Sequence, residues 1–295
     1  MKRSGKYSIV CRGLRGREEK RTIATLENSR KQKICLTIAG LDPSGGAGIL
    51  ADVRTFAAFG CYPAAVVTSL TFQNTTGVFG ADNVDKETLV GQLRPVLEDF
   101  PIDAAKTGML PTLELIEAAA DILTEYGIER IIVDPVVRST SGFDLIDNAA
   151  LRSLVKRLFP ISALVTPNLP EAERITGISI EEIDDIIAAA RLIGEMGARN
   201  VLIKGGHFLA EDPEMAGARD FLFLDGELIV LAGEYYETTA THGTGCALAA
   251  AITAGLALGY GLEDSVRTAK AFVNKAIRTA PNLGHGHSPI NISPI

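Results

Sequence analysis

The sequence predicts an α/β domain whose mostly parallel central sheet is covered by helices on both faces. Short β-branched, apolar runs alternate along the chain with longer segments of helical periodicity, a pattern typical of repeated strand–helix–strand units. The runs are apolar throughout, as strands buried on both faces are. A chain of 295 residues is also long enough to bury a sheet of this kind.

The elements follow one another in a regular order. A first strand is predicted at 34–39, where an apolar run ends at Gly40. A helix follows at 48–59, because Ile49, Val53 and Phe56 recur at helical spacing. Further strands are expected at 64–70, 104–106, 130–134, 163–166 and 200–204, and further helices at 85–98, 112–126, 147–158 and 181–196.

The last third of the chain changes character. Two β-rich runs, 221–224 and 227–231, flank the dipeptide Asp225-Gly226 and predict a hairpin with a tight turn. Two helices are expected at 244–259 and 262–280. The stretch 243–262 carries no charge, but its Ala and Gly content gives only a weak transfer energy into lipid. We therefore expect a buried helix and no membrane association.

Charge and cysteine content restrict the class of protein. Residues 1–33 carry 11 Lys and Arg against three acidic residues, whereas the net charge of the whole chain is −7. The acidic remainder argues against nucleic acid as a partner. Four scattered cysteines favour a reducing, cytoplasmic location without disulfides or zinc. We predict a disordered basic extension at 1–33, with a targeting segment or a misplaced start codon as alternatives, and one domain at 34–295.

Two glycine-rich loops precede predicted helices. The loop at 40–48 reads GLDPSGGAG and has the glycine spacing of a phosphate-binding loop, but Gly46 stands where the lysine of that motif belongs. Its glycines would let the backbone approach a ligand closely; the alternative is a turn that merely needs positive φ. The loop at 241–246 reads THGTGC. Consecutive glycines at a helix N-terminus direct backbone N–H groups at one point and predict an anion hole there.

Cys246 lies in the first turn of that helix, where a thiol pKa is lowered and the thiolate could act as a base. The alternative is a small buried cysteine that only packs.

Other polar residues follow the ends of predicted strands, where ligands bind in open α/β sheets. Asp134, Asn168 and Glu171 offer the oxygen ligands that Mg²⁺ prefers, although Asn168 could equally cap a helix. Lys204 is a point charge suited to phosphate, or else a solvated lysine beside a turn. Lys106 also lies at the end of a predicted strand, but its position indicates less about function. An anion hole, a base, oxygen ligands and a lysine are together the groups that phosphoryl transfer needs.

Six blocks, in order, resemble the hydroxymethylpyrimidine/phosphomethylpyrimidine kinases of thiamine biosynthesis, within the ribokinase-like superfamily. They are TIAGLDPSGGAG at 37–48, QNT at 73–75, KTGML at 106–110, TPNLPEA at 166–172, KGGH at 204–207 and HGTGC at 242–246. The resemblance implies a three-layer α/β/α fold, a homodimer, and phosphorylation of 4-amino-5-hydroxymethyl-2-methylpyrimidine and then of its monophosphate, with ATP and Mg²⁺. A pyridoxine/pyridoxal kinase and a non-catalytic pyrimidine sensor are the alternatives.

The resemblance also implies a role for each matching residue. Gln73 is expected to recognise the pyrimidine, since its amide offers both a donor and an acceptor. The other implied roles are pyrimidine binding for Gly40, Asp52 and Met109, metal binding for Asp134, Asn168 and Glu171, ATP phosphate binding for Lys204, Gly243, Thr244 and Gly245, and base catalysis for Cys246.

Overall fold

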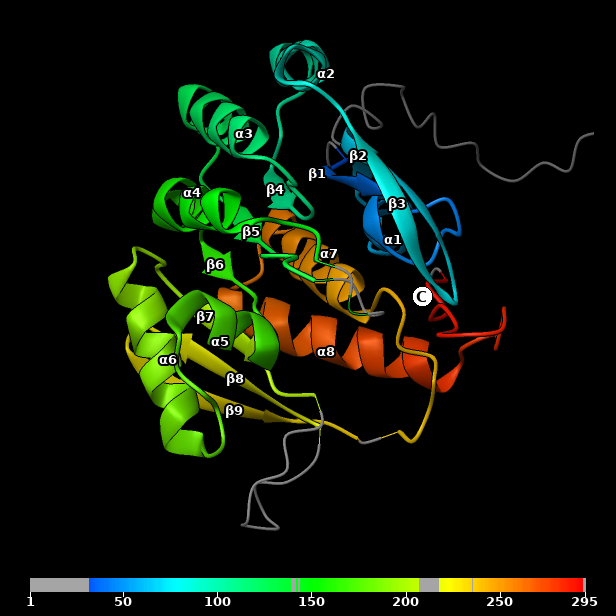
Figure 1. Cartoon of the computed structure of the whole chain (residues 1–295), viewed down its shortest axis with the longest axis vertical. Helices are drawn as coiled ribbons and strands as arrows, with labels where there is room; N and C mark the ends of the chain where they lie inside the picture. The colour runs from blue at the N-terminus through cyan, green and yellow to red at the C-terminus, as the bar shows by residue number, and fades with distance from the viewer. Residues whose placement is uncertain (1–31, 139–141, 143, 207–217, 235, 294–295) are drawn as a thin grey trace, which may run out of the picture. The chain divides into compact units, whose positions relative to one another are not determined.

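A single nine-stranded sheet runs through the computed structural model of the protein (Figure 1). Its strand order is β3-β2-β1-β4-β5-β6-β7-β8-β9. The six strands from β2 to β7 in this order are parallel, and β3, β8 and β9 add antiparallel edges. The strands are β1 (Ile34–Leu41), β2 (Tyr62–Asn74), β3 (Gly77–Asn83), β4 (Ala104–Thr107), β5 (Ile131–Val133), β6 (Leu164–Val165), β7 (Val201–Lys204), β8 (Arg219–Leu224) and β9 (Glu227–Ala232).

The structure describes residues 32–138, 142, 144–206, 218–234 and 236–293. The basic segment predicted as a disordered extension lies outside these residues, apart from Gln32 and Lys33. That part of the domain prediction stays a prediction.

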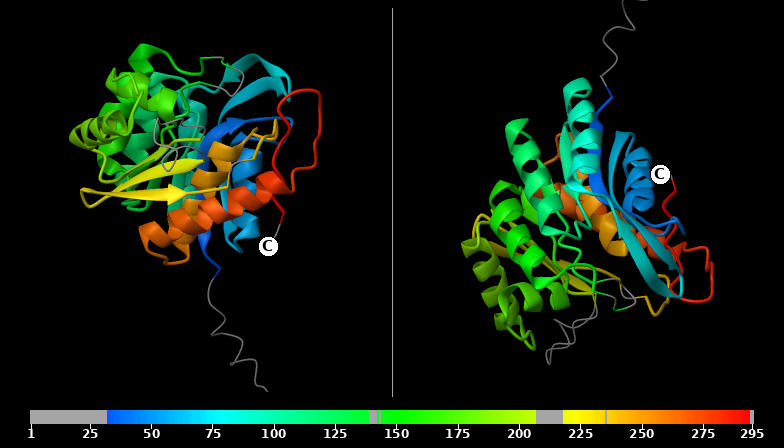
Figure 2. Two further views of the ribbon diagram at one scale, coloured as in Figure 1. Left: turned by 90° about the horizontal axis from the view of Figure 1, so that it is seen from below. Right: turned by 45° about the horizontal axis from the view of Figure 1, so that its top comes forward.

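Two layers of helices enclose the sheet (Figure 2). Side chains alternate between the layers along each strand: Ile131 and Val133 belong to one core, and Ile132 between them belongs to the other. One layer holds α2 (Lys86–Asp99), α3 (Leu113–Glu125), α4 (Asn148–Leu158), α5 (Leu169–Thr176) and α6 (Ile183–Glu195), and the other holds α1 (Gly48–Ala58), α7 (Thr244–Ala257) and α8 (Leu262–Arg278). The predicted three-layer α/β/α fold is confirmed.

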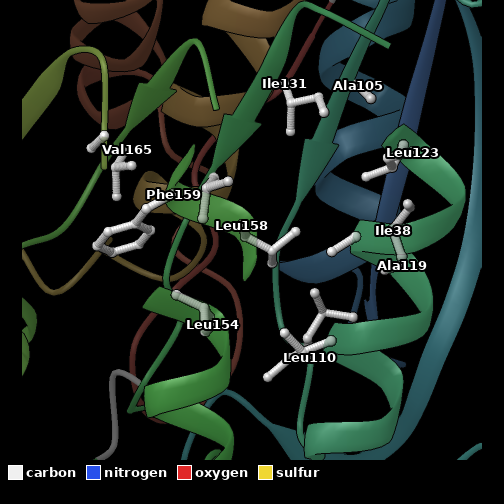
Figure 3. Packing of buried hydrophobic residues seen from close by; sticks show 14 of the residues in the cluster. Ile38, Ala105, Leu110, Ala119, Leu123, Ile131, Leu154, Leu158, Phe159 and Val165 are labelled. Atoms are coloured by element: carbon white, nitrogen blue, oxygen red, sulfur yellow. The ribbon is translucent and has the colours of Figure 1, made fainter. Parts of the chain in front are cut away.

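The larger core lies between the sheet and the first of these layers. Figure 3 shows Ala119 and Leu123 of α3 beside Ile38 of β1, with Phe159 near Val165 of β6. All of these side chains are fully or almost fully buried. This packing fixes the strand ends from which the loops of the cavity emerge.

The predicted elements agree with the structure except for α5, for which only a possible start at Asn168 was predicted, and for one sheet edge. β2 runs to Asn74, past its predicted end, and turns back as β3, which the sequence analysis did not predict. β3 reads GVFGADN and is half-exposed or exposed along its whole length. A strand that buries neither face has no alternating or continuous apolar pattern, so the sequence gives no signal for it.

The charge-free stretch forms the buried helix that was expected. Every residue of α7 from Ala247 to Ala257 is buried, because α1, α8 and the sheet surround it. None of the helices in the described part of the chain is long and apolar enough to cross a membrane. The small side chains of α7 let its neighbours approach closely. At Gly255, an added Cβ would lie 2.7 Å from Ser265 Oγ of α8.

The β8–β9 hairpin also forms as predicted. Asp225 and Gly226 both have positive φ, at 52° and 87°. This is the conformation that a two-residue type I′ turn requires.

We predict opposite effects for two helical Gly→Ala substitutions. Gly194→Ala in α6 should raise the free energy of unfolding by about 0.5–1 kcal/mol, because a Cβ there meets nothing within 4 Å and alanine is the better helix former. Gly255→Ala should lower it by about 1–3 kcal/mol through overpacking against α8. Urea unfolding of both variants measures the difference. Equal stability would contradict the close α7–α8 packing.

Candidate active site

A cavity of about 550 Å³ opens at the carboxyl ends of the parallel strands. Loops that follow β1, β4, β5, β6 and β7 contribute to its walls, together with the β2–β3 hairpin and the N-terminus of α7. Gln73 lies in the wall formed by the hairpin, and Lys204 and Cys246 lie in the wall formed by β7 and α7. Ligands bind at this edge in open α/β sheets, so the predicted site residues converge where the fold favours a site.

The two glycine-rich loops are joined by a buried hydrogen bond between Asp42 and His242. Asp42 accepts hydrogen bonds from the backbone N–H groups of Ser44 and Ala47, at 2.8 and 2.9 Å. His242 Nε2 lies 2.7 Å from Asp42 Oδ2. Burial would raise the pKa of Asp42, but hydrogen bonds from His242 and Ser44 lower it. Asp42 therefore shapes the first loop and attaches it to the second, a role that the sequence analysis did not assign.

Glycines are required where these loops touch. Gly243 has φ of 82°, and a Cβ there would lie 1.9 Å from the carbonyl oxygen of Gly46. A Cβ on Gly46 would in turn lie 2.2 Å from Cδ2 of His242. Gly45 and Gly48 have positive φ. The alternative explanation of the first loop, a turn that needs positive φ, therefore applies to these two glycines. These glycines thus serve contact between the loops as much as approach to a ligand.

Lys204 occupies the wall beside α7. Its Nζ lies 2.9 Å from Asp134 and 3.8 Å from Glu171, and an added Cβ on Gly245 would be 3.3 Å from it. Burial would lower the pKa of Lys204, but the carboxylates of Asp134 and Glu171 raise it, which favours the ammonium form. A positive charge is therefore held beside the N-terminus of α7, and the alternative of a solvated lysine is wrong.

Asn168 and Glu171 form a capping box at the start of α5. The side chain of Asn168 accepts from Glu171 N, and Glu171 Oε2 accepts from Asn168 N, both at 2.8 Å. Burial raises the pKa of Glu171 to about 7, although Lys204 acts against it. The helix-cap alternative for Asn168 is thus confirmed. Among the described residues, no group of three His, Cys, Asp or Glu side chains is arranged to hold a metal.

Lys106 lines the cavity and is fully buried. No feature of the sequence predicted this burial. Its Nζ donates to Asp52 Oδ2 at 2.9 Å, and Thr37 donates to the same oxygen at 2.6 Å. Burial would lower the pKa of Lys106, but Asp52 and the neighbouring Cys246 and Asp134 raise it. Asp52 itself does not line the cavity. The structure places it behind Lys106, where it positions the ammonium group.

Three other residues are expected around the pyrimidine: Gly40, Gln73 and Met109. All three line the cavity. Gly40 faces Met109 closely, since an added Cβ would lie 3.0 Å from the Met109 sulfur. Gln73 Nε2 donates to Thr71 Oγ1 at 2.6 Å. That hydrogen bond fixes the amide and leaves its second N–H and its oxygen for a ligand.

Cys246 lines the cavity in the first turn of α7, but its expected acidity is wrong. Burial raises the pKa of this thiol to about 11, although Lys106 and the backbone N–H of Gly48 act in the opposite direction. The carboxylates of Asp52 and Asp134 add to the increase. The sequence predicted the start of the helix. It could not show that the thiol is buried or that carboxylates lie near it.

This site on this fold defines a ribokinase-like small-molecule kinase, a phosphotransferase. The chain belongs to the phosphomethylpyrimidine kinase family, whose model matches residues 42–291. It is 42% identical over 260 residues to the hydroxymethylpyrimidine/phosphomethylpyrimidine kinase of Haemophilus influenzae, covering 88% of this chain and 96% of that protein. It is 45% identical over 256 residues to the thiamine biosynthesis bifunctional protein ThiED of Geobacter sulfurreducens, covering 87% of this chain but spanning only 51% of that protein.

Two solved structures share the fold. Phosphomethylpyrimidine kinase from Clostridium difficile matches with a TM-score of 0.73 and 40% identity, over 83% of this chain and 100% of that one. An ADP complex of Bacillus subtilis pyridoxal kinase matches with a TM-score of 0.80 and 34% identity, over 90% of this chain and 98% of that one. The kinase class and the ribokinase-like fold expected from the sequence are confirmed.

We predict that alkylation of Cys246 by iodoacetamide is slow at neutral pH and rises tenfold per pH unit up to at least pH 9.5. Only the thiolate reacts, and with a pKa of about 11 the thiolate fraction at pH 7 is about one in ten thousand. Mass spectrometry of the peptide that carries Cys246 follows the rate, with the buried Cys35 and Cys61 as internal controls. A plateau near pH 8 would show a lowered pKa instead.

Proposed function

We propose that this enzyme uses ATP to phosphorylate 4-amino-5-hydroxymethyl-2-methylpyrimidine, and then its monophosphate, to the diphosphate. One observation carries the proposal: a single cavity is lined by Gln73 and Met109 and also by Lys204 and the N-terminus of α7. The first pair suits an aminopyrimidine, and the second suits a phosphoryl group. The names of the relatives in both comparisons support the same activity.

In the first step, the hydroxymethyl oxygen of the substrate forms a bond to the γ-phosphorus of ATP, and the bond to the β,γ-bridging oxygen breaks to release ADP. The hydroxyl proton passes to a base, for which we propose the thiolate form of Cys246, because only that form can accept a proton. Lys204 and the backbone N–H groups at Gly243 and Gly245 stabilise the transferring group, whereas the N–H of Thr244 already donates to Thr241 O at 3.3 Å. In the second step, the acceptor is a phosphate oxygen that is already ionised near neutral pH.

Mg²⁺ is part of the proposal. Asp134 and Glu171 both line the cavity, and Mg²⁺ takes one or two carboxylates together with phosphate oxygens and water. The donor set therefore fits a nucleotide-bound Mg²⁺. When bound, the ion would neutralise charge on the phosphates. Asn168 would act by positioning Glu171, because its side-chain oxygen is engaged in the capping box.

The homodimer and the cytoplasmic location belong to the same proposal. The β2–β3 hairpin at the sheet edge exposes Leu70, Phe72 and Phe79, an apolar surface that supports self-association.

Pyridoxal phosphorylation is the second candidate, because pyridoxal kinases are among the structural neighbours. Gln73 and Cys246 favour the pyrimidine as the main acceptor. A coupled ADP-release assay should compare hydroxymethylpyrimidine, its monophosphate, pyridoxal and hydroxyethylthiazole. We expect the two pyrimidines to give the highest kcat/KM. A higher value for pyridoxal would overturn the main proposal.

Gln73→Leu tests recognition in the same assay. It should reduce kcat/KM for the pyrimidine by roughly ten- to a hundredfold, since buried polar partners are left unpaired. The KM for ATP should not change, because the proposal assigns Gln73 to the pyrimidine and not to the nucleotide. An unchanged kcat/KM for the pyrimidine would remove Gln73 from the recognition site.

Cys246→Ala should slow the first step more than the second. A positioned general base contributes about 10²–10⁴-fold, and only the first acceptor has a proton to lose. Single-turnover rates of each step measure the difference, with ATP binding as the control for the anion hole. Equal slowing of both steps would instead indicate that the thiol supports the shape of the loop. Slowing of the first step by less than about tenfold would rule out base catalysis.

A further inference from the structure

The segment after α8, residues 281–293, lies against the turn of the β2–β3 hairpin (Figures 1 and 2). We call it the C-terminal strap. His285 N donates to Thr75 Oγ1 at 3.2 Å, and His287 N donates to Thr75 O at 2.7 Å. A Cβ on Gly284 or Gly286 would lie 2.2 or 2.1 Å from atoms of Thr75. The strap therefore has a fixed register on the turn that follows Gln73.

The strap is also attached to the anion-hole loop. His242 N donates to Ser288 O at 3.3 Å, and Ile290 and Ile292 are buried in the core. Between these anchors, His287 lines the cavity, with its Nδ1 3.2 Å from Thr241 Oγ1. Thr241 lies two residues before Gly243, the N-cap of α7. His287 is thus held between the turn of the β2–β3 hairpin and the loop that precedes α7.

The charges around the cavity make this imidazole distinctive. Each lysine or arginine that lines it, among the described residues, pairs with a carboxylate. The pairs are Lys106–Asp52, Arg138–Asp144, Lys204–Asp134 and Lys270–Asp220. His242 is held by Asp42. His287 contacts a hydroxyl group instead, so its donor capacity is not consumed by an acidic partner within the described part of the chain.

The proposed reaction needs such a group at one step only. The first acceptor is a neutral alcohol, whereas the second carries a phosphate of about two negative charges at neutral pH. That phosphate must lie near the N-terminus of α7 to receive the second phosphoryl group. Two phosphates then meet in a cavity whose cations are already paired, so an additional donor on the acceptor side would favour binding of the monophosphate.

We propose that His287 is a specificity-determining residue for the phosphorylated acceptor, with Nε2 donating to the acceptor's phosphate while Thr241 holds Nδ1. The neutral Nε2–H tautomer and the imidazolium can both make this hydrogen bond. The inference rests on the proposed function, since it concerns the second of its two acceptors.

The test compares His287→Ala and His287→Gln with His285→Ala as the matched control. His285 lies two residues away in the same strap, does not line the cavity, and contacts Thr75 through its backbone. We expect His287→Ala to lower kcat/KM for the monophosphate about tenfold or more relative to kcat/KM for the alcohol, the range for a lost hydrogen bond to a charged group. His287→Gln should recover part of the loss, and His285→Ala should leave both values within about twofold of wild type.

Calorimetric titration of the monophosphate and the alcohol without nucleotide gives a second measurement. The affinity of His287→Ala for the monophosphate should fall by a similar factor, and its affinity for the alcohol should fall much less. An equal loss for both acceptors, or a loss for neither, would overturn the assignment of His287 alone. Failure of the wild-type enzyme to phosphorylate either pyrimidine would overturn the proposed function, and this inference with it.

Discussion

The contact between the two glycine-rich loops is the constraint on which the cavity depends. The loop after β1 and the loop before α7 are some 200 residues apart in sequence, yet Asp42 and His242 join them through a buried 2.7 Å interaction. The backbone oxygen of Gly46 occupies the space that a side chain at Gly243 would need. The N-terminus of α7 is thereby held against the loop that follows β1, and its orientation depends on this packing as well as on its own sequence.

Electrostatic pairing governs the rest of the site. Lys106 is buried and Lys204 is partly buried, and each is held by a carboxylate, which offsets the cost of removing an ammonium group from water. Burial raises the pKa of the nearby Cys246 thiol to about 11; Asp52 and Asp134 add to this increase, and Lys106 acts against it.

Helix α7 connects these features to the fold. Its N-terminus faces the cavity, and the rest of the helix is buried among α1, α8 and the sheet. Alanine and glycine dominate it because neighbouring backbones approach from all sides, as the close contact of Gly255 with Ser265 shows. A helix that is packed on every side cannot tilt easily. Rigid support of this kind keeps the N–H groups of its first turn at a constant position, as electrostatic stabilisation of a transferring group requires.

The sequence by itself determined the layered fold, nearly all its elements and the family, because apolar periodicity and the glycine blocks are local signals. It placed Gln73, Lys204 and Cys246 at strand and helix ends that proved to share one cavity. Only the tertiary structure decided which charges meet: that Lys106 is buried against Asp52, that Asp42 holds His242, and that His287 reaches the cavity from the far end of the chain. Burial and pairing arise from residues distant in sequence, and the acidity of Cys246 depends on them, so local pattern could not predict it.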